Sequence, residues 1–367
     1  MSSPPEFDAA VRDRLDRYLD REGLAAVWFA RSSNFAWVTG GDNVVDRAEE
    51  PGAAAAGYDG DRLRVVTSGI EADRLRVEEL PDGTAVESYP WYEKGLAGAV
   101  ATASPEPAAA DIPIEGFERV DAARLRLPLT DRDVERYRSL GRDAAGAVEA
   151  VCREVTPATT ERSTAGDLAG RLAAAGIDAP VVLVGGGRRA REYRHYTPSE
   201  AQLGDYALVS VTARRQGLFA SCTRTVAFDP PSWLTDRHEA AARVETTALE
   251  ATRHAGRRGD AAGDVFAGIQ SAYAALGYDG EWREHHQGGA TGHASREWIA
   301  TPDHEAPVEL PGAYAWNPTI QGAKSEDTVL VTDDGFDVLT TTDGWPTVET
   351  TAVDGATTLR RPAVLER

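Results

Sequence analysis

The segment "YALVSVTARRQGLFASCTRTVAF", residues 206–228, constrains the fold more than any other part of this sequence. Polar and apolar residues alternate with a period of two on both sides of a central Gln-Gly, a pattern typical of two strands joined by a tight turn. If the chain turns at Arg215-Gln216, with Gly217 relieving the turn, Ser210 lies opposite Ser221 on the neighbouring strand. The segment therefore predicts an antiparallel hairpin.

The same alternation gives the hairpin two chemically different faces. One face carries hydroxyl groups, those of Ser210, Thr212, Ser221, Thr223 and Thr225. The other face is apolar and includes Cys222, which we do not expect to be a nucleophile, because burial among apolar groups raises the pKa of a thiol. The residues alone leave two interpretations open: the hydroxyls pair with one another and with water, or they line a site.

The pattern of helices and strands predicts two domains. Residues before about 120 alternate helical and extended segments with Gly- and Asp-rich turns, which indicates a small α/β domain. Thr130 is a good residue to cap a long helix that begins near Arg132, and several helices and strands follow it. We therefore expect one domain over residues 1–124 and a second over residues 125–367.

The composition limits the partners of this chain. The formal net charge is −20, with 59 acidic residues and only two lysines, Lys94 and Lys324, so nucleic acid and anionic membranes are not expected to bind it. This bias resembles that of halophile proteins, in which surface carboxylates serve solvation. The chain shows no signal peptide and no apolar run long enough to span a membrane, which predicts a cytoplasmic protein. Two cysteines cannot form a disulfide framework.

Two further segments carry candidate functional residues. In "EWREHHQGGATGHASREW", residues 281–298, three of the seven histidines (His285, His286 and His293) lie among glycines. This clustering is compatible with a metal site, an acid–base site or simple packing. In "SEDTVLVTDDG", Asp334-Gly335 predicts a hairpin turn, and alternation places Glu326 on the face opposite Asp327. A carboxylate at the start of an apolar strand is functional only if other groups converge on it.

These segments together resemble the pita-bread hydrolases, which include methionine aminopeptidase, aminopeptidase P, prolidase and creatinase. The hairpin looks like the family's strand pair that ends in Asp-x-Thr-Arg-Thr, "EHHQGGATGH" looks like its Gly-His-Gly-x-Gly segment, and "NPTIQGAKSEDT" looks like its closing Glu-Pro and Glu-Asp-Thr strands. "RSSNFAWVTGG" is similar to the creatinase-type N-terminal domain. The resemblance implies an α+β chain, with a curved antiparallel sheet and flanking helices after a smaller α/β domain.

The resemblance also assigns the site residues. Two aspartates, a histidine and two glutamates hold a pair of divalent ions in the metal-dependent members, and these positions are Ser210, Ser221, His286, Asn317 and Glu326 here. Neutral hydroxyl and amide oxygens are poor ligands for such ions, so we expect no metal and no other cofactor. By analogy with creatinase, His286, His293, His195 and Glu326 are expected to be catalytic, with Ser210, Ser221, Asn317 and Arg224 in contact with substrate.

The expected function is metal-independent hydrolysis of a carbon–nitrogen bond in a small peptide-like or amidino compound. Two alternatives stay open: a non-catalytic binding protein that retains the pocket, and an Xaa-Pro metalloaminopeptidase. The resemblance further implies a homodimer that acts on a small molecule or a short peptide.

Overall fold

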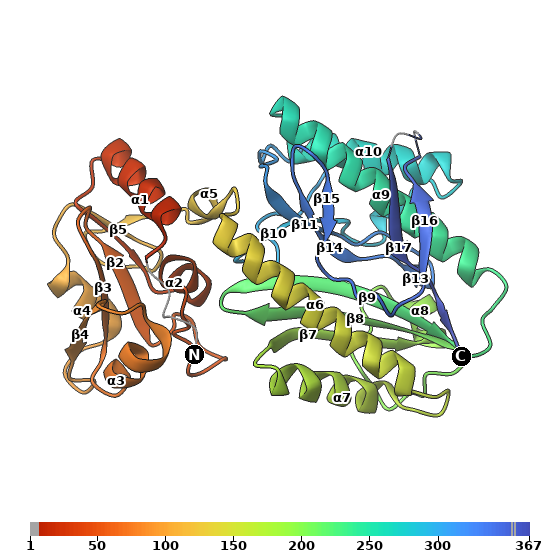
Figure 1. The fold of residues 1–367 in the computed structure, drawn as a ribbon, viewed down its shortest axis with the longest axis horizontal. Helices are drawn as coiled ribbons and strands as arrows, with labels where there is room; N and C mark the ends of the chain where they lie inside the picture. The colour runs from red at the N-terminus through yellow and green to blue at the C-terminus, as the bar shows by residue number, and fades with distance from the viewer. Residues whose placement is uncertain (1–6, 354, 356) are drawn as a thin grey trace. The chain divides into compact units, whose positions relative to one another are not determined.

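The structure is a computed structural model that describes residues 7–353, 355 and 357–367 (Figure 1). The chain forms two compact units, Met1–Arg132 and Asp133–Arg367. The expected boundary between residues 124 and 125 falls inside a short helix, α5 (Ala123–Arg126), eight residues before the division between the units. The expectation of no signal peptide depends partly on residues 1–6, which lie outside the described residues.

The first unit is an α/β domain around one six-stranded sheet, in the order β4-β3-β2-β1-β5-β6. Its strands are β1 (Ala26–Phe29), β2 (Ala54–Tyr58), β3 (Leu63–Ser68), β4 (Ala85–Tyr89), β5 (Ala108–Ala110) and β6 (Glu118–Arg119). Its helices are α1 (Ala9–Glu22), α2 (Ser32–Thr39), α3 (Ala72–Arg74), the π-helical turn η1 (Leu75–Glu79), α4 (Leu96–Ala103) and α5. The side chain of Asp8 caps α1 by accepting hydrogen bonds from the backbone N–H groups of Ala10 and Val11, as an N-terminal aspartate should.

The second unit contains the strands on which the candidate site is built. One sheet has the order β18-β9-β8-β7, a second has the order β10-β11-β14-β15, and two small hairpins complete the unit. Its strands are β7 (Asp178–Gly186), β8 (Tyr206–Arg215), β9 (Leu218–Ala227), β10 (Gly288–Thr291), β11 (Gly312–Trp316), β12 (Thr319–Ile320), β13 (Ala323–Lys324), β14 (Asp327–Val331), β15 (Phe336–Val338), β16 (Thr347–Thr351), β17 (Thr358–Pro362) and β18 (Leu365–Glu366).

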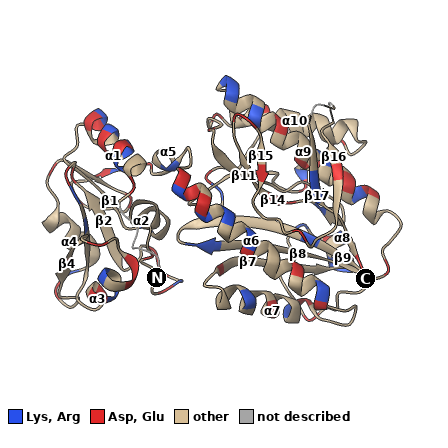
Figure 2. Cartoon of the chain, in the orientation of Figure 1, with Lys and Arg blue, Asp and Glu red and all other residues tan. Residues whose placement is uncertain are grey.

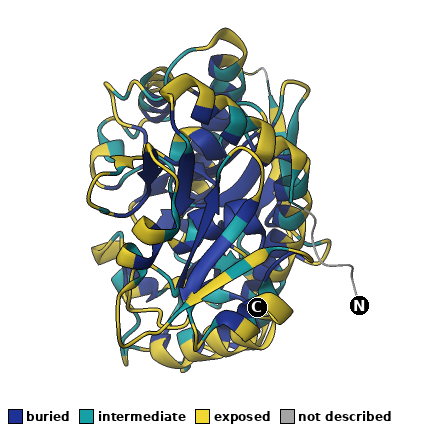
Figure 3. Ribbon diagram, turned by 90° about the vertical axis from the view of Figure 1, so that its left-hand side faces the viewer, coloured by how far each residue is buried: buried dark blue, intermediate teal, exposed yellow. Residues whose placement is uncertain are grey.

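Helices cover the outer faces of these sheets (Figure 1). They are α6 (Asp131–Glu154), α7 (Glu161–Ala174), α8 (Gly187–Glu192), α9 (Leu234–Arg258), α10 (Ala262–Ala275) and the 3₁₀ turn η2 (Glu281–Arg283). The apolar faces of α9 and α10 pack with β10, β11 and β14 in one core cluster, and the central strands of the sheets are largely buried, whereas several edge strands are partly exposed (Figure 3). None of the helices in the described parts of the chain is long and apolar enough to cross a membrane. Acidic and basic residues are spread over the helices (Figure 2).

The central hairpin forms as predicted, but its cross-strand pairing differs. Ser210 pairs with Thr223, and Thr212 pairs with Ser221, so the predicted pairing of Ser210 with Ser221 is wrong. The turn is Gln216-Gly217, where both residues have positive φ (49° and 79°), one position later than predicted. Moving the turn by one residue changes each cross-strand partner by two residues. The hydroxyl groups therefore remain on one face, as predicted.

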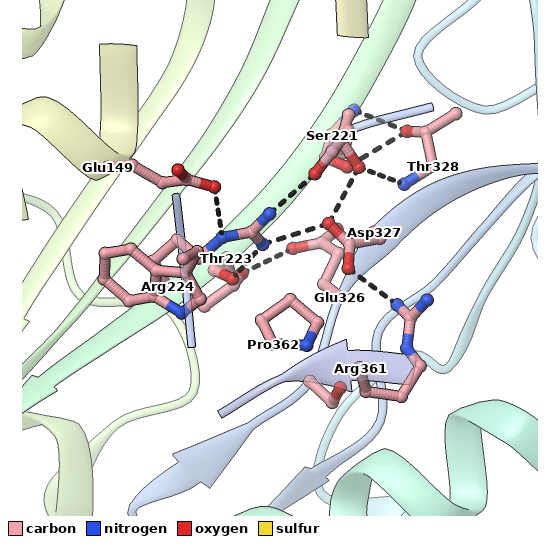
Figure 4. A network of polar contacts seen from close by, with 12 residues as sticks. Glu149, Ser221, Thr223, Arg224, Glu326, Asp327, Thr328, Arg361 and Pro362 are labelled. Atoms are coloured by element: carbon pink, nitrogen blue, oxygen red, sulfur yellow. Dashed lines mark hydrogen bonds and ion pairs between the residues drawn. The ribbon is translucent and has the colours of Figure 1, made fainter. Parts of the chain in front are cut away.

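A buried network of arginines and carboxylates joins the two sheets behind the hydroxyl face (Figure 4). Asp327 lies between Arg224, at 3.0 Å, and Arg361, at 2.8 Å. Arg361 also forms an ion pair with Glu245 of α9, and Arg224 lies 3.4 Å from Glu149 of α6. Because the side chains of both arginines are 0% exposed, each buried carboxylate depends on these partners to offset its desolvation.

This network predicts a large loss of stability when one arginine is removed. Arg361→Met leaves Glu245 and the second oxygen of Asp327 without their buried cation, so we expect the free energy of unfolding to fall by about 3–5 kcal/mol. Arg188→Met is the control, because it removes an exposed ion pair with Glu192, for which we expect a change below about 1 kcal/mol. Denaturant titration measures both values, and equal small losses would contradict this role of Arg361.

Candidate functional site

Glu326 is the centre of the candidate site, and three side chains from separate segments converge on it. Lys324 Nζ lies 2.8 Å from Glu326 Oε2, and Arg296 Nη2 lies 3.1 Å from Glu326 Oε1. The hydroxyl of Thr223 on β9 donates to Glu326 Oε2 at 2.8 Å, while the backbone N–H of Thr223 donates to the carbonyl of Glu326 at 3.0 Å. These two bonds fix the start of β14 against the central hairpin.

Both serines of the hydroxyl face connect to this centre. Ser210 Oγ lies 2.7 Å from Thr223 Oγ1, which in turn donates to Glu326. Ser221 Oγ lies 2.9 Å from Thr212 Oγ1 and accepts a 3.3 Å hydrogen bond from Arg296. The hydroxyls therefore pair with one another across the strands and also border the charged cluster.

Three histidines form a second cluster beside the charged one. The Nε2 atoms of His195 and His285 are 3.1 Å apart, and the rings of His285 and His286 stack with their centroids 4.4 Å apart. The structure explains why one position of this segment is a glycine. Gly288 has φ 93°, and a Cβ there would lie 2.1 Å from the carbonyl oxygen of Ala315, so only glycine lets the histidine segment approach β11 this closely.

Burial and nearby positive charge keep the imidazoles neutral at pH 7. Burial lowers the pKa of His286 to about 4, with further lowering by the charges of Arg296 and Lys324. Burial and then Lys324 lower the pKa of His285 to about 2, and the same two causes lower the pKa of His195. Glu326 shows the opposite balance: burial would raise its pKa, but Lys324 and Arg296 outweigh burial and lower it.

The other predicted site residues occupy different positions. His293 is buried, and its Nε2 lies 3.3 Å from Asp133 Oδ1, which ties it to the beginning of the second unit. Asn317 directly follows β11; its backbone N–H donates to the carbonyl of Gln287, and its Oδ1 has no hydrogen-bond partner in the described part of the chain. Glu326 and Asp327 project to opposite faces, as predicted.

Arg224 corrects one expectation about substrate contact. It lies next to Thr223 on β9, so strand alternation sends its side chain to the face of Cys222, away from the hydroxyl groups. There it is fully buried and donates to Asp327 and to the carbonyl of Thr340. Arg224 is therefore a residue of the buried network and not a substrate contact. Cys222 is buried as predicted, and burial raises the pKa of its thiol.

Sequence reasoning missed Lys324, Arg296 and His285 as site residues. One signal was present for Lys324, because the chain has only two lysines and this one lies two residues before Glu326. Arg296 is one of many arginines, and nothing in its sequence context distinguishes it. His285 occupies a position that the resemblance assigned no role.

Comparison with known proteins identifies the family. The model of metallopeptidase family M24 matches residues 135–333, which is more than half of the chain. The chain belongs to this family. The Xaa-Pro dipeptidase of Pyrococcus horikoshii is 24% identical over 246 residues, which are 63% of this chain and 68% of that relative. The expected pita-bread fold of the M24 proteins is thereby confirmed.

Solved structures share the fold over both units. The prolidase from Pyrococcus horikoshii OT3 has a TM-score of 0.74 at 18% identity and covers 91% of this chain and 98% of its own. The prolidase from Pyrococcus furiosus has a TM-score of 0.72 at 19% identity and covers 89% and 99%. The N-terminal domain of the FACT complex subunit SPT16 from chickpea also matches, with a TM-score of 0.62 at 13% identity and coverage of 92% and 97%. Because the fold occurs in differently named proteins, the site must decide the function.

The residues at the expected ligand positions do not fit a pair of divalent cations. The two oxygens of Glu326 already bind Arg296, Lys324 and Thr223, and Ser210, Ser221 and Asn317 offer only neutral oxygens. Lys324 and Arg296 also place two fixed positive charges next to Glu326, and each of them would repel a divalent cation bound there. The attraction of the single Glu326 carboxylate offsets the repulsion from only one of these two cations.

The pKa shifts predict a specific titration of this site. Since the folded-state pKa of His286 is about 4 and the unfolded value is near 6.5, the unfolded chain binds protons first as the pH falls. We therefore expect this histidine to destabilise the fold progressively from about pH 6.5 to about pH 4. In an NMR titration, the His286 resonance, assigned by its absence in His286→Gln, should have a midpoint near pH 4. A midpoint near 6.5 would contradict the described surroundings.

Proposed function

We propose that this M24 protein hydrolyses a carbon–nitrogen bond in a small peptide-like or amidino compound without a pair of metal ions. The observation that carries the proposal is the ion-pair cluster in which Lys324 and Arg296 together hold Glu326. Two fixed side-chain cations supply positive charge next to the serines at the expected ligand positions. A neutral histidine that can accept a proton lies within the field of both cations.

The proposed reaction uses water as the nucleophile. His286 takes one proton from the water as its oxygen attacks the carbonyl or amidino carbon, and Nδ1 of this histidine has no partner in the described residues. Lys324 and Arg296 stabilise the negative charge that develops on the carbonyl oxygen of an amide, or on the nitrogen of an amidino group that binds in its neutral form. The protonated His286 then donates its proton to the leaving nitrogen, the carbon–nitrogen bond breaks, and the imidazole returns to its neutral form.

The low pKa of His286 makes it a weak base before substrate binds, and the reaction itself changes that. Positive charge on Arg296 and Lys324 is a main reason, after burial, for the low pKa. A negative charge that forms beside these cations cancels part of their effect on the imidazole. Proton transfer to His286 is thus favoured at the stage at which the substrate becomes anionic. The ring of His285, whose Nε2 lies 3.1 Å from that of His195, stacks on the ring of His286 and orients it.

A second candidate is hydrolysis of Xaa-Pro dipeptides with one bound metal ion. One observation favours it: ligand atoms of His195, His285 and His286 all lie within 4.8 Å of one another. Imidazole nitrogens suit borderline ions such as zinc, and three such ligands are typical of catalytic zinc sites. The charge of Lys324, which reaches all three imidazoles, opposes this candidate.

Turnover assays separate the two candidates. We expect hydrolysis of at least one compound in a panel of dipeptides, amides, lactams and amidines, with a rate unchanged after exhaustive treatment with a metal chelator. His286→Gln should lower kcat/KM by about 10²–10⁴-fold, because it removes proton transfer and preserves the volume of the side chain. Arg188→Met is the matched control, with an exposed side chain on α8.

Other results would contradict the proposal in different ways. Xaa-Pro hydrolysis that the chelator abolishes and zinc or manganese restores would establish the metal-dependent candidate. No turnover of any compound, together with ligand binding that His286→Gln abolishes, would establish a binding protein.

A further inference from the structure

We infer that Lys324 and Arg296 form an anion-binding site that takes the carboxylate of a small acid, at the place where the family resemblance implies two divalent cations. The inference deepens the proposed function and rests on it in one respect: hydrolysis of an amide produces a carboxylate at the carbon that water attacks. The acid product therefore carries its negative charge at the position where the two cations stabilise the reaction.

The charges of the cluster favour an anion. Lys324 and Arg296 contribute two positive charges and Glu326 contributes one negative charge, so one positive charge is left over. The rings of His195, His285 and His286, which lie beside this cluster, contribute no negative charge to it. The hydroxyls of Ser221 and Thr223 add no charge. The groups that carry this excess charge are largely shielded from water, and the attraction of such a charge for an anion is stronger there than in bulk water.

Both cations also have N–H groups that could donate further hydrogen bonds to a ligand. An ammonium group has three N–H donors, and Lys324 Nζ has one ion-pair partner in the described part of the chain, Glu326. Arg296 directs Nη1 to Ser221 and to the carbonyl of Ser295, and Nη2 to Glu326, while its Nε has no partner among the described residues. A carboxylate needs such N–H donors and gains charge-assisted hydrogen bonds from them.

Exposure indicates the size of ligand that this site admits. The side chains of Lys324 and Glu326 are each 5% exposed, whereas that of Arg296 is 12% exposed and His195 lies at the surface. His195 and Arg296 are thus the more exposed members of the cluster, and the cations are too enclosed to contact a macromolecular surface. Lys324 stands out chemically as well, because this chain of net charge −20 has only one other lysine.

Isothermal titration of the full-length protein tests the inference with N-acetylglycine, an acid, and N-acetylglycinamide, its neutral amide. Potassium chloride at one fixed concentration is the salt in every titration, because an organic anion such as gluconate or acetate would bring a competing carboxylate to the site. We expect the acid to bind at least tenfold more tightly than the amide. Lys324→Met should weaken binding of the acid at least tenfold, because it removes the excess positive charge, while Arg188→Met should have no effect.

Glu326→Gln is the decisive variant, because it removes a negative charge and almost no volume. It leaves two cations without a carboxylate, so we expect tighter binding of N-acetylglycine, the opposite of what damage to the fold would cause. Thermal unfolding of each variant verifies that it is folded. If Lys324→Met does not fold, Glu326→Gln alone decides the question.

Equal affinity for the acid and the amide, or weaker binding of the acid by Glu326→Gln, would overturn the inference. Its failure is distinguishable from failure of the proposed function. Chelator-resistant turnover without any preference for acids would keep the hydrolase and reject the anion site. Tight binding of the acid without turnover of any compound would keep the anion site and reject the hydrolase.

Discussion

Glu326 shares its two oxygens between a buried ammonium and a nearly buried guanidinium, and the chemistry of the site depends on this arrangement. A lone carboxylate at this depth would take up a proton or attract cations from solution. Lys324 and Arg296 instead keep it ionised, as its lowered pKa indicates, and their own charge lowers the pKa of the neighbouring histidines. The two cations thus keep Glu326 ionised, add to the effect of burial on His286, and decide the sign of the charge that a ligand should carry.

This cluster is supported by a second set of charges on the opposite side of the same strands. Glu326 and Asp327 are adjacent in sequence but face opposite ways, Glu326 into the candidate site and Asp327 into the network of Arg224 and Arg361. The network anchors β14 to β9, to α6 and, through Glu245, to α9. Because Glu326 directly precedes β14, the buried network that anchors this strand also positions the carboxylate of the candidate site.

Local patterns predicted much of this fold, and long-range contacts account for what they missed. Strand alternation predicted the hydroxyl face of the hairpin and the opposite directions of Glu326 and Asp327. The exact pairing failed because it depends on one turn residue, Gln216, in the left-handed conformation, which favours glycine over other residues. Arg224 was misplaced because the resemblance overrode the strand alternation. The pairing of Arg296 with Glu326 joins residues thirty positions apart and is visible only in three dimensions. The expected homodimer and the role of His293 stay predictions.

The central claim is that side-chain cations occupy the role that the family resemblance assigns to metal ions. Equilibrium dialysis of the wild-type protein against manganese tests it most directly, with a Ser210→Asp/Ser221→Asp/Asn317→Glu/Lys324→Met variant as the reference for a restored ligand set. The account predicts well under one tightly bound equivalent in the wild-type protein and increased binding in the variant. Two tightly bound equivalents in the wild-type protein would contradict it.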